Sequence, residues 1–450
     1  MAEPQDGELG EPPSVAALSI SETANKVAKE QEVTPWDVSA GTDAEGNAKP
    51  FDYEAIAQKW DTKIIDEALL ERFEKVTGQK PHIFLRRGLF FSHRDFDKIL
   101  DLYERGEKFF LYTGRGPSAG AMHIGHTIPF EFTKYLQEVF DVPLVIMLTE
   151  DEKFFFKKDI DIKTALKYAK ENAKDIISMG FDVKKTFIYS DFIYRGEGGK
   201  YFEYNSAELS KLINFNQVRG AFGFDQSTNV GRIAFPPIQC AAAIATSYPH
   251  IFGDPYDVYE DLRSPKTAKI QCLIPMGIDQ DPYFRLVRDN ASRMPVPSPK
   301  PAIIHSKFLT ALQGIAGKMS ASDPNSAIFM TDTPKEIKNK INKHAFSGGQ
   351  ETLELHREKG GNPDVDVAYQ YCTYFLEDDD ALAKLYKDYK SGELLTGNLK
   401  KQAIELVQPY VAVYQKRRAE VTDEMMRDFM KPRKLEAKGN PNPKKPEEKK

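Results

Sequence analysis

The sequence predicts an α/β domain built on a parallel sheet, followed by an all-helical C-terminal domain. Two observations support this fold class. Short apolar runs alternate with helix-patterned segments up to about residue 332, and beyond it the strand signals stop while helix patterns continue. The length of 450 residues, with 41% hydrophobic and 29% charged side chains, agrees with a globular protein of two domains or one large domain.

The N-terminal part is predicted as two segments. Residues 1–32 are acidic, rich in Pro, Ser and Ala, and free of aromatic side chains, which is typical of a disordered extension. Residues 33–107 are predicted as a β/helical preface to the α/β domain, because helix patterns begin at residue 51 and an amphipathic helix ends at Gly106.

The predicted α/β domain spans residues 108–332. Apolar runs predict strands over 108–113, 143–148, 186–191, 271–276 and 302–306. Helix patterns separate them over 126–140, 163–179, 206–214, 238–245 and 281–294, and this alternation implies parallel strands. Helix-like segments then continue over 333–430, and the Lys-rich residues 431–450 are predicted to be a basic disordered tail.

Charge and composition restrict the class of protein only partly. The formal net charge of −5 divides into −7 over the first 50 residues, +5 over the last 20 and −3 over the rest, so a nucleic-acid surface would have to be a local patch. No run of about 18 apolar residues and no secretion signal occurs, which predicts a cytoplasmic protein that does not contact a membrane. Cys240, Cys272 and Cys372 lack C-x-x-C spacing and are predicted to be core residues.

A glycine-rich loop follows the first predicted strand of the α/β domain. Gly114, Gly116 and Gly120 are spaced one residue away from the dinucleotide-binding fingerprint, and no P-loop or H-E-x-x-H motif is present. The loop ends in the H-x-G-H motif formed by His123, Gly125 and His126 at the start of a predicted helix. Two imidazoles at a helix N-terminus, separated by a Gly that permits close approach, predict binding of nucleotide phosphates.

A second motif, K-M-S-A-S, follows the last predicted strand. Lys318, Ser320 and Ser322 lie in a loop with nearby glycines, where an ammonium group and two hydroxyls could close over a polyphosphate. Alone this motif is weak, because an ordinary polar loop would look the same. Its position after the last strand, with H-x-G-H after the first, makes the motif a stronger indication of nucleotide binding.

H-x-G-H after the first strand and K-M-S-x-S after the last resemble the motif pair of class I aminoacyl-tRNA synthetases. From about residue 34 to residue 435 the chain also resembles the eukaryotic cytoplasmic tryptophanyl-tRNA synthetases, through TPWDV, YTGRGPSAGAMHIGHTIPF, CLIPMGIDQDPYFRLVRD and LQGIAGKMSASDPNSAIFMTDT among other segments. The resemblance implies a Rossmann-like catalytic domain over 108–332, an anticodon-binding helical domain over 333–430, and a homodimer. It implies activation of L-tryptophan by ATP with Mg²⁺, followed by transfer to tRNA(Trp).

The resemblance also implies roles for single residues. Catalytic roles fall to His123, His126, Lys318 and Arg115, and ATP-binding roles to Gly116, Gly125, Gly277, Asp279, Met319, Ser320 and Ser322. Tyr112 and Gln280 would bind the indole N–H, and Glu152 and Gln239 the α-amino group, with Mg²⁺ held by the ATP phosphates and not by protein ligands. Met147 departs from the family pattern, because it stands where a polar side chain can face the substrate amino group.

Three alternatives are weighed against this interpretation. A tyrosine-specific relative would share the fold and both motifs, but Gln280 in GIDQDPYF and the TGRGPSAGAMH segment favour tryptophan. A smaller H-x-G-H nucleotidyltransferase would lack K-M-S-A-S in this position and the helical domain. A non-catalytic synthetase-like RNA-binding module is disfavoured by the intact motifs. Exposed cations of the helical segment, namely Lys335, Lys338, Lys340 and Lys343, are candidate contacts with the tRNA backbone, or equally a solvated helix face.

Overall fold

The computed structural model describes residues 30–35, 38–43, 49–254, 266–319 and 323–444. Its strands are β1 (Glu32–Val33), β2 (Val38–Ser39), β3 (Lys63–Ile64), β4 (Phe90–Arg94), β5 (Phe109–Arg115), β6 (Leu144–Leu148), β7 (Thr186–Ser190), β8 (Gln271–Gly277), β9 (Ala302–Ser306), β10 (Thr310–Ala311) and β11 (Gly314–Lys318). The predicted strands correspond to β5 to β9, each within two residues at either end, so these predictions are confirmed.

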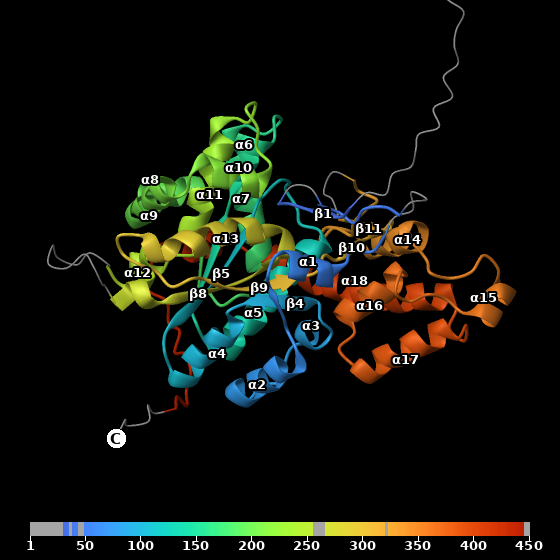
Figure 1. The fold of residues 1–450 in the computed structure, drawn as a ribbon. Helices are drawn as coiled ribbons and strands as arrows, with labels where there is room; N and C mark the ends of the chain where they lie inside the picture. The colour runs from blue at the N-terminus through green and yellow to red at the C-terminus, as the bar shows by residue number, and fades with distance from the viewer. Residues whose placement is uncertain (1–29, 36–37, 44–48, 255–265, 320–322, 445–450) are drawn as a thin grey trace, which may run out of the picture.

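The helices surround these strands (Figure 1). Before and between the strands of the large sheet lie α1 (Tyr53–Lys59), α2 (Glu67–Thr77), α3 (Ile83–Arg86), α4 (Phe96–Arg105), α5 (Ile124–Phe140), α6 (Glu150–Phe156), α7 (Ile162–Ile177), α8 (Asp191–Glu197), α9 (Lys200–Leu212), α10 (Phe215–Phe222), α11 (Val230–Ala241), α12 (Pro249–Phe252) and α13 (Asp281–Asn290). The C-terminal helices are α14 (Pro334–His344), α15 (Leu353–Lys359), α16 (Val367–Phe375), α17 (Asp379–Lys390), α18 (Thr396–Glu420) and α19 (Asp423–Met430).

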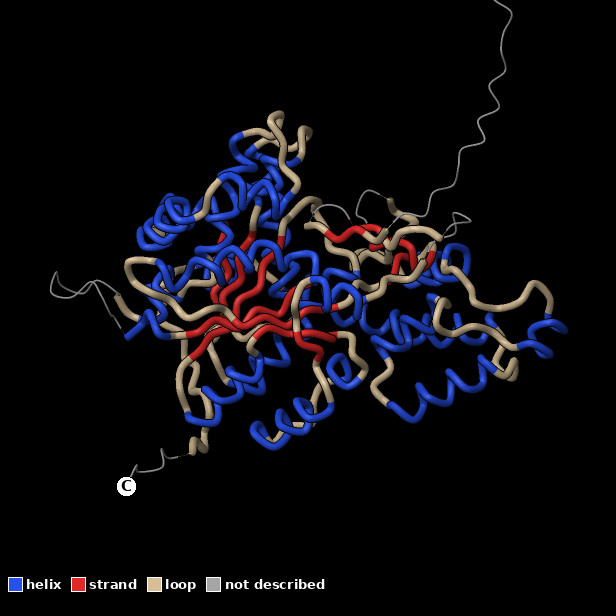
Figure 2. The backbone as a smooth tube through the Cα atoms, viewed as in Figure 1, coloured by secondary structure: helices blue, strands red, loops and turns tan. Residues whose placement is uncertain are grey.

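Within the described residues, the large sheet has the strand order β3-β4-β9-β8-β5-β6-β7, and it runs through the middle of the molecule (Figure 2). The strands from β9 to β7 are parallel, as the alternation of strands and helices predicts. β4 runs antiparallel to both of its neighbours, β3 and β9. A small sheet with the order β1-β2-β11-β10 lies near α14 (Figure 1).

The central strands are apolar throughout because both faces of the sheet are covered. Along β6 the side chains of Leu144, Ile146 and Leu148 join one buried cluster, and those of Val145 and Met147 join the cluster on the opposite face. Alternate side chains of a strand point to opposite faces, so a continuous apolar run is what a sheet with helices on both sides requires.

The sequence missed several elements. β3 and β4 extend the large sheet beyond β9, whereas the sequence locates no individual strand in this part of the preface. The helix predicted to begin at residue 238 begins at Val230 instead. α11 continues through Pro236 and Pro237, although proline usually marks a helix boundary. The short helices α6, α8, α10 and α15 were also missed, since each has fewer than nine residues and gives little periodicity.

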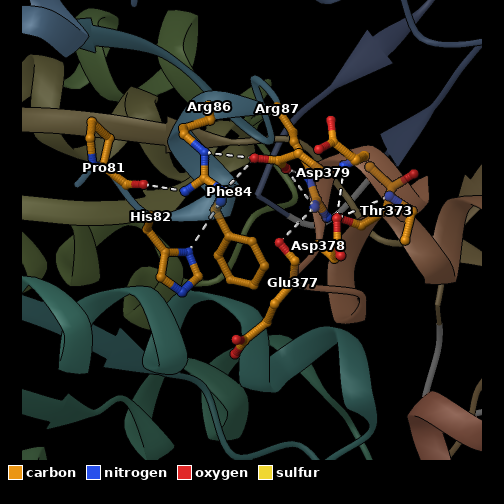
Figure 3. Close-up of polar contacts among 11 residues, drawn as sticks. Pro81, His82, Phe84, Arg86, Arg87, Thr373, Glu377, Asp378 and Asp379 are labelled. Carbon is orange, nitrogen blue, oxygen red and sulfur yellow. Dashed lines mark hydrogen bonds and ion pairs between the residues drawn. The ribbon is translucent and has the colours of Figure 1, made fainter. Parts of the chain in front are cut away.

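The C-terminal helices share a buried apolar cluster with one face of the large sheet. A polar contact reinforces this packing, as Figure 3 shows. The carboxylate of Asp379, at the start of α17, accepts from Arg86 Nη2 at 2.6 Å and from Arg87 Nη2 at 2.7 Å. Arg87 Nη1 also donates to the carbonyl oxygen of Thr373 at 2.8 Å. Adjacent arginines at the end of α3 therefore hold the junction between α16 and α17.

The expectation of a disordered tail is corrected for residues 431–444. After α19, which contacts β7, the chain runs along the large α/β domain past α4 (Figure 1). The Glu436 N–H donates to the Lys184 carbonyl, the Gly439 N–H to that of Asp141, and the Asn440 amide to that of Tyr103, at 2.7–2.8 Å. Residues 445–450, and residues 1–29 of the expected N-terminal extension, lie outside the described residues.

Candidate active site

A cavity of about 360 Å³ lies at the C-terminal ends of β5 and β8, above the N-terminus of α5. It is lined by most of the predicted site residues: Tyr112, Arg115, Gly116, His123, Gly125, His126, Glu152, Gln239, Gly277, Asp279, Gln280 and Met319. This is the place where an open parallel sheet offers a crevice, because the chain leaves β5 toward β6 on one side while β8 flanks β5 on the other. The structure therefore brings most of the residues that the motifs indicate to one cavity.

The two histidines of H-x-G-H form the first turn of α5. His123 is the N-cap in an extended conformation, and its backbone N–H donates to His126 Nδ1 at 3.3 Å. The two rings are stacked, with centroids 3.4 Å apart. Because Nδ1 of His126 accepts this bond, the proton of the neutral ring is on Nε2. The motif thus presents a defined imidazole donor at a helix N-terminus.

Gly125 is required by close packing between these rings and the second motif. A Cβ at this position would lie 3.2 Å from His123 Nδ1 and 3.2 Å from Met319 Sδ. Met319 is buried against the cavity. Lys318 ends β11, whose Gly317 pairs with Ser39 of β2. The Lys318 side chain, and Ser320 and Ser322, lie outside the described part of the chain.

Arg115 ends β5 at the cavity wall. Its Nε donates to Asn172 Oδ1 at 3.2 Å, and burial lowers the pKa of the guanidinium to about 10, so the group stays charged at neutral pH. Its Nη2 is buried and has no hydrogen-bond partner among the described residues. A buried charged donor without a partner is costly, and an anion in the cavity would satisfy it. This is the chemistry of a phosphate site.

Glu152 is fixed in the first turns of α6, directly after β6. Its Oε2 lies 2.9 Å from Lys153 Nζ and accepts from Thr149 Oγ1 at 3.2 Å, while Oε1 accepts from the Tyr283 hydroxyl at 3.1 Å. A Cβ on Gly116 would overlap the Lys153 side chain, so the glycine loop packs directly on this ion pair. These three contacts hold the carboxylate at the wall of the cavity.

Tyr112 forms the apolar end of the cavity with only 1% of its surface exposed. Gln239 Nε2 donates to its hydroxyl oxygen at 2.5 Å, and the hydroxyl donates to Met147 Sδ at 3.4 Å. Burial raises the pKa of Tyr112 well above its usual value, so the phenol remains neutral. These two bonds leave one lone pair of the phenolic oxygen available as an acceptor. Gln239, which we expected near a substrate amino group, contacts Tyr112 in this structure.

Gly277, Asp279 and Gln280 form the turn between β8 and α13 and line the other side of the cavity. A Cβ on Gly277 would lie 2.6 Å from Asp279 Oδ1, so the turn folds tightly around this glycine. The next residue, Asp281, is fully buried and contacts His305 Nε2 at 2.9 Å. This buried contact with β9 fixes the turn below Gln280.

Sequence reasoning missed Lys153, Asn172 and Tyr283. Lys153 follows Glu152 in a charged run that gave no sign of its contact with the glycine loop. Asn172 lies in the middle of a helix, and Tyr283 lies 131 residues from Glu152, its partner. The only available signal was the polar Asn172 on the buried side of an amphipathic helix.

Three further observations concern metal, membrane and cysteines. No cluster of three or more His, Cys, Asp or Glu side chains suited to a metal ion occurs within the described ranges. No helix in the part of the chain that the structure describes is long and apolar enough to cross a membrane. Cys240, Cys272 and Cys372 are buried free thiols, as predicted.

Comparison with known proteins agrees with this geometry. The family model "tRNA synthetases class I (W and Y)" matches residues 104–411. The cytoplasmic tryptophan–tRNA ligase of Homo sapiens is 54% identical over 408 residues, covering 91% of this chain and 82% of that protein. The Saccharomyces cerevisiae protein of the same name is 53% identical, covering 92% of each chain. The solved structure of tryptophanyl-tRNA synthetase from Giardia lamblia superposes with a TM-score of 0.77 at 45% identity, covering 84% of this chain and 95% of that one.

Proposed function

This chain belongs to the class I tRNA synthetase family of the tryptophan and tyrosine type, and on that premise we propose that it is a cytoplasmic tryptophan–tRNA ligase. It activates L-tryptophan with ATP, giving tryptophanyl-adenylate and pyrophosphate, and transfers the tryptophanyl group to the 3′ end of tRNA(Trp). The family model covers tyrosine enzymes as well, but the relatives described above are tryptophan–tRNA ligases. They disfavour both the tyrosine-specific reading and the non-catalytic module.

The observation that carries this proposal is the single cavity that brings H-x-G-H, Arg115 and Tyr112 together. One end offers donors to an anion, and the other offers an apolar wall with one polar oxygen. ATP phosphates suit the first end and an indole suits the second. The distance between the reacting groups is then set by β5, which carries both Arg115 and Tyr112.

The first step needs positioning and charge compensation, and no general base. The carboxylate of tryptophan is ionised at neutral pH, and it attacks the α-phosphorus as the bond to the β-phosphate oxygen breaks and pyrophosphate leaves. We assign the Nε2 donor of His126, the helix N-terminus at His123 and the Nη2 donor of Arg115 to the phosphate oxygens. Lys318 would add a further cation from the K-M-S-A-S loop.

Mg²⁺ is part of this proposal as an ion held by the ATP phosphates. It would neutralise phosphate charge during activation. The buried Nη2 donor of Arg115 supports a polyphosphate at this end of the cavity, since that donor needs an anionic partner.

Tyr112 supports selection of tryptophan. The phenol donates to Met147 and accepts from Gln239, so its remaining lone pair can accept only from a donor, which the indole N–H supplies. Phenylalanine would leave this acceptor unpaired at the end of a buried pocket, and that loss is the basis of discrimination. We place Gln280 beside it and Glu152 at the substrate ammonium group.

The helical segment is proposed to bind the tRNA anticodon region. Lys335, Lys338 and Lys343 of α14 are exposed and remain candidate contacts with the tRNA backbone. Lys340 is a poor candidate, because its Nζ lies 2.6 Å from Asp332 Oδ2 and donates to the Ala327 carbonyl. The ammonium group of Lys340 is already paired with the Asp332 carboxylate.

We propose that two copies of the chain associate through α8 to α11. Each of these helices carries one exposed apolar side chain, namely Ile193, Tyr204, Phe215 or Val230. Association through these helices would remove apolar surface from water, and a two-fold symmetric dimer would bury each side chain in both copies. Light scattering of the purified protein would detect the dimer, and a monomer at micromolar concentration would contradict it.

The decisive experiment is ATP–pyrophosphate exchange with the purified protein and each of the twenty amino acids, at saturating Mg²⁺-ATP and without tRNA. Exchange with tryptophan alone is the expected result. Exchange with tyrosine would keep the fold and refute the pocket assignment. No exchange from folded protein would support the non-catalytic module.

A further inference from the structure

We propose that Asn172, on α7, is a positioning residue that holds the Arg115 guanidinium on the phosphate side of the cavity, and that Arg418 of α18 holds the turn of α7 that carries it. The inference rests on the proposed function, because it gives Arg115 a role at the ATP phosphates. It concerns residues that touch neither substrate, and it extends the site from the cavity wall to the C-terminal helices.

The amide of Asn172 has a single orientation compatible with its surroundings. Its Nδ2 donates to the carbonyl oxygens of Ala119 at 2.8 Å and of Tyr168 at 3.0 Å, so both amide protons are used. Its Oδ1 therefore faces the Nε of Arg115, from which it accepts at 3.2 Å. A flipped amide would place its oxygen against two carbonyls and its protons against a guanidinium. Asn172 is fully buried, so no rotation to solvent competes.

The same amide joins two parts of the phosphate side. Ala119 belongs to the glycine-rich loop that begins after β5, and Arg115 ends β5. Asn172 thus fixes the loop and the guanidinium relative to each other. Without it, Nε of Arg115 would lose its partner, and the direction of the buried Nη2 donor would no longer be set. An error of about 1 Å in such a group can cost on the order of 100-fold in rate.

Arg418 forms ion pairs with two residues of α7, Glu171 before Asn172 and Asp175 after it. Its Nε donates to Asp175 Oδ1 at 2.8 Å, and its Nη2 donates to Glu171 Oε2 at 2.7 Å. Asp175 is buried and its charge acts on Arg115. Arg418 therefore also neutralises the carboxylate that would compete with substrate for the Arg115 guanidinium. Both effects predict that loss of Arg418 weakens the interaction of Arg115 with the ATP phosphates.

A matched control residue, Asp423, contacts the same helix, α7. Asp423 of α19 contacts Lys170 Nζ at 3.2 Å and Lys174 Nζ at 2.7 Å, so it also ties α7 to the C-terminal helices. Within the part of the chain that the structure describes, no hydrogen bond or ion pair joins these lysines to Asn172 or Arg115, and the side chain of Asp423 is half-exposed. Removing Asp423 loosens the attachment of α7 without touching the guanidinium.

The experiment measures ATP–pyrophosphate exchange with tryptophan, binding of tryptophan alone by calorimetry, and the midpoint of thermal unfolding, for wild type and four variants. Asn172→Ala and Arg418→Ala are expected to lower kcat by about 10- to 100-fold while the Kd for tryptophan changes less than about twofold. Asn172→Asp keeps the acceptor but loses both amide donors, and it is expected to fall between Asn172→Ala and wild type. Asp423→Ala is expected to retain kcat within about twofold.

Several results would overturn the inference. They are an unchanged kcat in folded Asn172→Ala, equal losses of kcat in Arg418→Ala and Asp423→Ala, and parallel losses of kcat and tryptophan affinity. If Asn172→Ala does not fold, Arg418→Ala and its control decide. Exchange by the wild-type protein distinguishes failure of the proposed function from failure of this inference. If the wild type shows no exchange with tryptophan, the proposed function is refuted. If the wild type exchanges and Asn172→Ala is fully active, only this inference is refuted.

Discussion

Replacing Glu150 by Gln is expected to make the protein more stable at pH 8 and to leave it little changed near pH 4.5. Glu150 begins α6 and is fully buried. Its Oε1 accepts from the Phe192 N–H at 3.0 Å and from the Ser190 hydroxyl. Burial raises the pKa of this carboxyl to about 7. The folded protein therefore keeps a proton at pH values where the unfolded chain has released it.

The sign and size of the expected stability change follow from the difference in the pKa of Glu150 between the folded and unfolded states. Between pH 4.5 and about 7 the native state binds more protons at Glu150 than the unfolded state, so stability falls as pH rises and then levels off. A pKa difference of this size corresponds to about 3 kcal/mol. Gln keeps the oxygen that accepts from Ser190 and Phe192 but cannot ionise. The free energy of unfolding of the variant, relative to wild type, is expected to rise by up to that amount over this interval.

The assay is urea denaturation of both proteins at constant ionic strength between pH 4.5 and 8. The neighbouring Asp151 and Asp191 are also buried, with pKa values raised chiefly by burial. The charge of Glu150 raises the pKa of Asp191 further, so its removal lowers that pKa and acts in the same direction, toward higher stability of the variant as pH rises. A stability difference that does not depend on pH, or that falls as pH rises, would refute the reasoning.

Three further predictions concern the cavity and the domain junction. Gly125→Ala crowds His123 at 3.2 Å, so kcat of pyrophosphate exchange should fall by about tenfold while the Kd for tryptophan is kept; equal losses would argue against crowding of the phosphate side alone. Tyr112→Phe removes the indole acceptor and leaves Gln239 without its partner, so the KM for tryptophan should rise by about tenfold, and an unchanged KM would contradict the pocket assignment. Asp379→Ala leaves Arg86 and Arg87 without their carboxylate and should lower the unfolding midpoint by about 1–2 °C in low salt. This difference should shrink in 1 M NaCl, and a salt-independent loss would point to packing instead.

The sequence predicted those parts of the fold whose signal is local. The parallel strands were found because each is a short apolar run between helix patterns, and the cavity was found because H-x-G-H and the β8 turn carry recognisable residues at strand ends. β4 was missed because its sequence, FFSHR, ends in polar residues, which become covered where β4 pairs with β3 and β9. Asn172 was missed because its partners, Arg115 and Ala119, lie more than 50 residues away. Contacts of that range leave no pattern in a single sequence.

The segment after α18 returns to the first domain. α19 packs on β7, and the chain then follows the outer surface to the neighbourhood of Tyr103. In terms of connectivity, the helices from α14 to α18 are therefore an insertion between two stretches of one unit, and not an appendage at its end. Deleting everything after residue 332 would strip the β7 edge of its covering helix. An α/β domain on its own would therefore need a short linker that joins residue 332 to the start of α19. Such a protein would keep α19 and residues 431–444 in place.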